Sequence, residues 1–189
     1  MNDRPAPQQA RAAKTRLKLL DAAATVVRRD GIPAMTLARV AEEAGVSKGG
    51  LLHHFGSKEE LLAGLLEQTL ADADASLNEM TDADGRGAFA RAYLEYVRRP
   101  DDHQADSATA IFAAAAAGDG DLGPTSEVFE AWQHRLMHDD GLDPALGLLA
   151  RIVGDGLWLI DLFGLARPSE AERAAVIDLV ARLLDDPVQ

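Results

Sequence analysis

Residues 36–58 read TLARVAEEAGVSKGGLLHHFGSK, and the first half of this stretch has the spacing of a short helix. Its apolar residues fall at positions i, i+3, i+4 and i+7, which lie on one face of a helix. These residues are Leu37, Val40, Ala41 and Ala44. Thr36 can cap the start with its hydroxyl, and Gly45 stands at the end, where a left-handed conformation favours glycine. The stretch therefore predicts a helix with both ends marked.

A second short helix is expected directly after the turn at Gly45. Ser47 can cap its first turn, and Leu51 and Phe55, four residues apart, can share its buried face. Two short helices joined by a tight glycine turn form a helix-turn-helix. The sequence therefore predicts this motif between Thr36 and Phe55.

The second helix begins with two glycines that stability does not explain. Gly49 and Gly50 each cost about 0.5–1 kcal/mol relative to Ala inside a helix. Glycine lets a backbone approach a surface closely, and donors suited to phosphates or base edges surround the pair. These donors are Ser47, Lys48, His53, His54 and Lys58. The sequence predicts a DNA-contacting face here, and the alternative is a loop whose polar residues are only solvated.

Three motifs carry a resemblance to a known family. AEEAGVSKG at 41–49, HF at 54–55 and SKEEL at 57–61, within the stretch 15–66, resemble the DNA-binding domain of the TetR (tetracycline repressor) family. The resemblance implies that Phe55 is a core residue. The positions that it implies contact DNA are Thr36, Ser47, Lys48, Gly49, His54 and Lys58.

Two positions of this chain depart from the family pattern. Gly50 stands where members typically carry Thr or a similar residue, and Leu52 stands where they carry a Tyr that commonly contacts a phosphate. Gly50 has no side chain with which to read a base, and Leu52 cannot make the phosphate contact. These departures keep open the alternative of a domain that has lost its reading function.

Composition and charge place limits on the function. The chain has 189 residues, of which 47% are hydrophobic, and no Cys, so a globular protein without disulfides or thiolate metal sites is expected. It shows no signal-like or membrane-spanning apolar run, which predicts a soluble cytoplasmic protein with no membrane partner.

The net charge is −12. Residues 1–62 carry ten Lys or Arg and seven Asp or Glu, a net +3, whereas residues 63–189 carry nine and twenty-four, a net −15. A basic surface suited to phosphates is therefore confined to the first part.

The rest of the chain has helical spacing throughout, which predicts an all-α fold of about nine helices. Their expected starts lie near Arg11, Leu37, Ser47, Ser57, Phe89, Asp101, Pro124, Asp143 and Pro168. The expected domains are a disordered tail at 1–10, a three-helix DNA-binding domain at 11–56, and a helical bundle for ligand binding and dimerisation at 57–189. Ser57 and Glu60 form a capping box for the long helix that joins the two, and the resemblance implies that its tilt carries information between them.

The last two helices are expected to form a dimer interface. The helix ending near Leu165 is apolar nearly all round, which is typical of a helix buried on several sides. Pairing with its copy across a two-fold axis would place the second helices of the two helix-turn-helix motifs about 34 Å apart on DNA. The resemblance implies this dimer. The alternative is a helix buried wholly inside a monomer. The expected interface residues are Leu157, Ile160, Phe163, Val176, Leu179, Val180 and Leu183.

Most of the aromatic residues lie in the second domain, where helix bundles hold ligand cavities. For any one of them an ordinary core position is the favoured interpretation, but as a set, together with the resemblance, they predict a mostly apolar pocket. The expected lining is Phe89, Tyr93, Tyr96, Phe112, Trp132, Asp155 and Trp158. The ligand is an unknown small-molecule effector.

No enzymatic, metal or cofactor site is expected. Glu130, His134 and His138 are spaced i, i+4, i+8 and could bind a metal, but a solvated helix face explains them as well. Asp155 and Asp161 are six residues apart and project from different sides of their helix, so they do not form a catalytic pair. Arg151, one turn before Asp155, predicts an ion pair instead.

These observations together predict a ligand-responsive transcription regulator. We expect a homodimer that binds double-stranded operator DNA of palindromic sequence, acts as a repressor, and releases the DNA when the effector binds. The alternative from another class is a small-molecule carrier or sequestering protein on the same fold, with weak or lost DNA binding.

Overall fold

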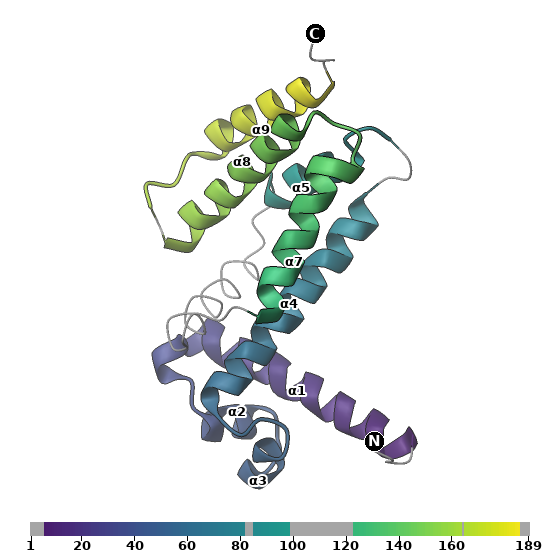
Figure 1. Ribbon diagram of the computed structural model, residues 1–189. Coiled ribbons are helices and arrows are strands. Elements are labelled where there is room, and N and C mark those ends of the chain that lie inside the picture. The colour runs from purple at the N-terminus through teal and green to yellow at the C-terminus, as the bar shows by residue number, and fades with distance from the viewer. Residues whose placement is uncertain (1–5, 82–84, 99–122, 164, 186–189) are drawn as a thin grey trace. The chain divides into compact units, whose positions relative to one another are not determined.

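The computed structural model describes residues 6–81, 85–98, 123–163 and 165–185. The described chain divides into two compact units, with the boundary between Thr69 and Leu70. This boundary falls inside α4 (Lys58–Met80), so one continuous helix contributes to both units (Figure 1). The predicted all-α class is confirmed: the described residues form eight α-helices, a 3-10 turn and a π-helical turn, and no strand. The helix expected from Asp101, and with it Phe112, lies outside the described residues.

The first unit consists of three helices gathered around the start of α4 (Figure 1). Its elements are α1 (Ala6–Asp30), the 3-10 turn η1 (Ile32–Ala34), α2 (Leu37–Glu43), α3 (Lys48–Leu52) and the first half of α4. Leucines of α1 and α4 pack with Met35, Val40, Leu51 and Phe55 into one core. Gly64 of α4 allows this packing, because a Cβ there would lie 2.9 Å from the Phe55 ring. The apolar periodicity of the sequence thus becomes the core that holds the helix-turn-helix.

The helix α1 begins earlier than the sequence pattern suggested. It starts at Ala6, five residues before Arg11, so part of the expected tail at 1–10 is helical. Pro7 is compatible with this start, because proline lacks a donor that the first helical turn leaves unused. A glycine ends α1: Gly31 has φ +75° and its N–H donates to the Val27 carbonyl at 2.8 Å.

The second unit is a helical bundle. Its elements are the second half of α4, α5 (Ala88–Arg98), α7 (Gly123–His134), the π-helical turn η2 (Arg135–Asp139), α8 (Pro144–Phe163) and α9 (Glu170–Asp185). α5 packs against both α8 and α9, and α8 and α9 run antiparallel side by side (Figure 1). A capping box begins the last helix, since Ser169 Oγ accepts from the Glu172 N–H at 3.3 Å and Glu172 accepts from the Ser169 N–H at 2.8 Å. None of the helices in the described ranges has the length and apolar character needed to cross a membrane.

The helix that was expected to start near Pro124 begins at Gly123 and changes its winding after His134. Over Arg135–Asp139 the turn is π-helical, and the Asp140 N–H donates to the Arg135 carbonyl at 3.0 Å. The wider turn brings the buried Asp140 carboxylate to the start of α5, where it accepts from the N–H groups of Phe89 at 2.9 Å and Ala90 at 2.8 Å. A residue fifty positions away therefore caps α5, which no local pattern could indicate.

Candidate DNA-binding surface

Side-chain caps define both helices of the helix-turn-helix. Thr36 Oγ accepts from the Arg39 N–H at 3.2 Å at the start of α2, and Gly45 ends that helix with φ +60°. Ser47 Oγ accepts from the Gly50 N–H at 3.0 Å at the start of α3. These are the three caps that the sequence predicted. Each hydroxyl keeps its own O–H, so Thr36 and Ser47 can cap their helices and still donate to a phosphate.

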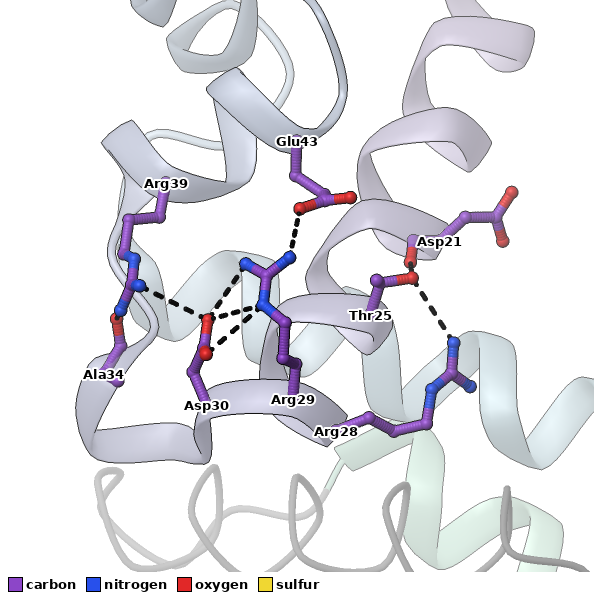
Figure 2. A network of polar contacts seen from close by, with 8 residues as sticks. All are labelled: Asp21, Thr25, Arg28, Arg29, Asp30, Ala34, Arg39 and Glu43. Atoms are coloured by element: carbon purple, nitrogen blue, oxygen red, sulfur yellow. Dashed lines mark hydrogen bonds and ion pairs between the residues drawn. The ribbon is translucent and has the colours of Figure 1, made fainter.

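Ion pairs fix α2 to the end of α1 (Figure 2). The Arg29 guanidinium pairs with Asp30 and with Glu43 of α2, each at 3.0 Å, and Arg39 of α2 pairs back to Asp30 at 3.4 Å. The hydrogen bond from Arg29, helped by the charges of Arg29 and Arg39, holds the pKa of Asp30 below its usual value. Arg39 also donates to the Ala34 carbonyl at 3.3 Å. Both guanidinium groups therefore serve to orient α2.

The exposed side of α3 combines Lys48, Gly49, Leu52 and His53. The opposite side is buried, with Leu51 and Phe55 in the core. Lys48 makes no hydrogen bond or ion pair with any residue that the structure describes. Its ammonium group is therefore available to a phosphate or to a guanine edge.

Packing within the unit requires no glycine at position 49, whereas a side chain at position 50 would press against the Ser47 hydroxyl that caps α3. A Cβ added at Gly49 would meet nothing closer than Ser47 Oγ at 4.0 Å, and one at Gly50 would lie 3.3 Å from the same atom. Open space in front of Gly49 means that the helix presents bare backbone there. A bare backbone allows closer approach to a surface than any side chain would permit.

The remaining predicted contact residues follow α3. His53 is exposed and His54 half-buried, with their rings edge to face at a centroid distance of 5.5 Å. Ser57 Oγ accepts from the Glu60 N–H at 3.0 Å, so the predicted cap of α4 is present. The return bond differs from a standard capping box, because Glu60 accepts from the Gly56 N–H at 2.7 Å. Lys58 is half-buried in the first turn of α4. The predicted residues other than Thr36, which caps α2, thus lie on α3 or in the segments directly before and after it.

The predicted ligand residues of the second unit lie mostly inside the bundle. Tyr93 and Trp132 are buried, with ring centroids 6.2 Å apart, and the Tyr93 hydroxyl donates to Asp155. Burial, reinforced by the negative charge of Asp155 and by this hydrogen bond, raises the pKa of Tyr93 well above its usual value. Arg151 pairs with Asp155 at 3.1 Å, as the sequence predicted. Tyr96 and Trp158 are half-buried.

Two surface hollows lie in the second unit. The larger, of about 640 Å³, borders the start of α5 and η2 and includes Phe89. The smaller, of about 420 Å³, lies between α7, η2 and α8 and is lined by Phe129, Met137, Arg151 and polar residues of α7. Tyr93, Trp132 and Asp155 line neither of these two hollows. Three of the residues that line the smaller one are Glu130, His134 and His138, whose i, i+4, i+8 spacing was considered above for metal binding.

His134 and the two aspartates of α8 considered above for metal binding or catalysis have other partners. His134 Nδ1 lies 3.0 Å from Asp139, and no cluster of three metal-ligating side chains occurs within the described ranges. Asp161 forms an ion pair with the buried Arg173 of α9. Asp155 and Asp161 thus belong to separate ion pairs.

Of the predicted dimer residues, three on α9 are solvent-exposed: Val176, Leu179 and Leu183. Leu157 and Val180 are buried within the protomer, and Ile160 is half-buried. The side chain of Phe163 lies outside the described part. On α8 the exposed apolar residues are Leu148, Ile152 and Leu159, which sequence analysis did not select. Their i, i+4, i+11 spacing places them on one face of the helix, and this spacing could have identified them from the sequence.

Comparison with known proteins places both units in one family. Residues 19–65 match the model of bacterial regulatory proteins of the tetR family, and residues 87–185 match the tetracyclin repressor-like C-terminal domain. The chain is 35% identical over 95 residues to the HTH-type transcriptional repressor KstR2 of Rhodococcus jostii, covering 50% of this chain and 45% of that protein.

Two longer matches agree with this assignment. The HTH-type transcriptional repressor KstR of Mycolicibacterium smegmatis is 28% identical over 180 residues, covering 89% of this chain and 86% of that one. The crystal structure of a transcriptional regulator from Rhodococcus sp. Rha1 has the same fold, with a TM-score of 0.73 and 22% identity over 92% of this chain and 99% of that one. The chain therefore belongs to the tetR family of bacterial regulatory proteins.

Proposed function

We propose that this chain is a cytoplasmic, homodimeric repressor that binds a near-palindromic operator through α3 and releases it when a small molecule binds the second unit. We assign DNA reading to residues 11–56 and effector binding and dimerisation to residues 57–189. The observation that carries the proposal is the exposed face of α3, where unpaired Lys48 stands beside bare backbone. The proposed DNA contacts are Thr36, Ser47, Lys48, Gly49, Gly50, His53, His54 and Lys58.

Titration with DNA from the region upstream of its own gene tests this proposal. We expect selective binding relative to an unrelated duplex, with two protomers or more per site and affinity that falls steeply with salt. Weak binding that is equal for both duplexes would mean either that the operator lies elsewhere or that the protein does not recognise a DNA sequence. In the second case, the function as a small-molecule carrier would replace the proposed one.

Lys48→Ala is expected to weaken operator binding by about 1 kcal/mol per half-site, roughly fivefold each, because it removes a donor in the major groove. The loss should be smaller on the unrelated duplex. Lys14→Ala provides the matched control, since Lys14 is an exposed lysine of α1. If Lys14 contacts DNA at all, its removal should weaken both duplexes alike, as loss of a phosphate contact does. Unchanged affinity and sequence preference for Lys48→Ala would exclude Lys48 from the reading face.

The proposed dimer forms through the exposed apolar residues of α8 and α9. Leu179 is 48% exposed on α9, and two-fold symmetry would bury it twice in a dimer. Leu179→Ala should weaken dimerisation by about 2 kcal/mol, roughly 30-fold, in sedimentation equilibrium. Leu17→Ala removes an equally exposed leucine, 48%, from α1 and should leave dimerisation unchanged. Equal effects of the two substitutions would place the interface elsewhere.

The proposed effector response rests on contacts of α7 and η2 with the second half of α4. Trp132 Nε1 donates to Asp74 at 2.7 Å, and Arg135 donates to Asn78 at 2.6 Å. The Arg135 guanidinium also lies 3.8 Å from the centroid of the Phe89 ring. A molecule that shifts α7 or η2 would therefore act directly on α4, the helix shared by both units. If the effector binds one position of α4 more tightly than another, it shifts the protein toward that position. The factor by which the effector then changes the affinity for the operator equals the factor by which the operator changes the affinity for the effector.

A further inference from the structure

Leu52 is an apolar side chain on a face that otherwise serves polar contacts. It is 42% exposed, although single exposed leucines are common on protein surfaces. Its position is what distinguishes it, because it lies one turn after Lys48 on the exposed side of α3. A group that binds this side of the helix through Lys48 would meet Leu52 as well.

The chemistry of the major groove leaves one base-edge group that suits Leu52. Leucine has no donor or acceptor, so it cannot bind a phosphate or the polar edge of a base. Thymine alone presents a methyl group at C5 in the major groove, and apolar side chains contact it. Burying such a methyl would also cover the exposed part of Leu52.

The neighbouring glycine makes this contact reachable. Gly49 adjoins Leu52 on the exposed side of α3, and no side chain fills the space in front of it. The helix can therefore lie closer to the bases than it could with a side chain at that position. A leucine is shorter than a tyrosine or an arginine, and close approach compensates for its limited reach.

We infer that Leu52 is a specificity-determining residue that reads the C5 methyl group of a thymine in each operator half-site. The inference rests on the proposed function and adds a base preference to it. It requires thymine at one defined position of each half-site. The preference must depend on the methyl group rather than on hydrogen bonds.

Replacing single operator thymines by deoxyuridine removes only the methyl group and tests the inference. For the wild-type dimer we expect about fourfold weaker binding per half-site at one thymine position and no change at the others. Leu52→Ala should bind thymine and deoxyuridine operators equally, whereas Leu52→Met should retain the methyl dependence. Placing 5-methylcytosine instead of cytosine at that position should improve wild-type binding but not binding by Leu52→Ala.

Leu17→Ala is the matched control, because it removes another exposed leucine from the same unit and should retain the full methyl dependence. A wild-type protein that binds its operator selectively but tolerates deoxyuridine everywhere would overturn the inference and leave the proposed function standing. Methyl dependence that persists in Leu52→Ala would overturn it as well. Failure to bind any duplex selectively would overturn the proposed function and this inference with it.

Discussion

Asp161→Ala is expected to lower the free energy of unfolding by about 3 kcal/mol, because it leaves a buried guanidinium without its counter-ion. Arg173 is only 7% exposed and forms an ion pair with Asp161 of α8. It also donates to the Val97 carbonyl of α5 at 3.0 Å, so it joins three helices of the second unit. The expected loss lies at the lower end for buried pairs, since the Asp161 side chain is 20% exposed. Urea unfolding at constant protein concentration would measure it.

Two further variants isolate the buried charge as the cause. Asp161→Leu combined with Arg173→Met replaces the whole pair by apolar side chains and should recover most of the lost stability. Asp178→Ala removes another α9 ion pair, with Arg98 at 2.6 Å, but the Asp178 side chain is half exposed, so little change is expected. Equal losses for Asp161→Ala and Asp178→Ala would contradict the importance of burial.

Gly147→Ala is expected to destabilise the second unit by about 3 kcal/mol, since an added methyl group would overlap backbone atoms. An added Cβ would lie 2.0 Å from the Leu136 carbonyl oxygen and 2.7 Å from its carbonyl carbon. Backbone of the π-helical turn cannot rotate aside as a side chain can. The helix α8 would have to move away from η2, and the melting temperature should fall by about 6–12 °C.

Gly156→Ala provides the control on the same helix. A Cβ at Gly156 meets nothing within 4 Å in the protomer, so this substitution should maintain stability or raise it by about 0.5–1 kcal/mol. Thermal unfolding of both variants beside the wild type would separate the two cases. Similar melting temperatures for Gly147→Ala and the wild type would contradict the close approach of α8 to η2.

The helix-turn-helix could be predicted from sequence because its determinants are local. Thr36 and Ser47 cap helices that begin one residue later, and Gly45 supplies the left-handed turn between them. Each signal lies within a few residues of the structure that it specifies. The early start of α1 was missed, since proline in a first turn resembles proline in a tail.

The second unit was less predictable because its determinants lie far apart in the sequence. Capping of α5 by Asp140 depends on a π-helical turn that apolar spacing does not reveal. The orientation of α8 was also ambiguous, because a helix that is apolar nearly all round gives no sign of which side faces its own protomer. Leu157 was therefore assigned to the dimer interface although it is buried in the bundle.

The open space in front of Gly49 has a consequence for the evolution of such regulators. Leu51 and Phe55 are fixed by the core, and changing either would cost folding stability. Position 49 has no such constraint from the core, since an added Cβ there would meet nothing closer than Ser47 Oγ at 4.0 Å and would gain helix propensity. A duplicated gene can therefore acquire a new operator preference through one substitution at this position while its product continues to fold. Residues that can change the target site and residues that maintain the fold therefore lie within one turn of each other on α3.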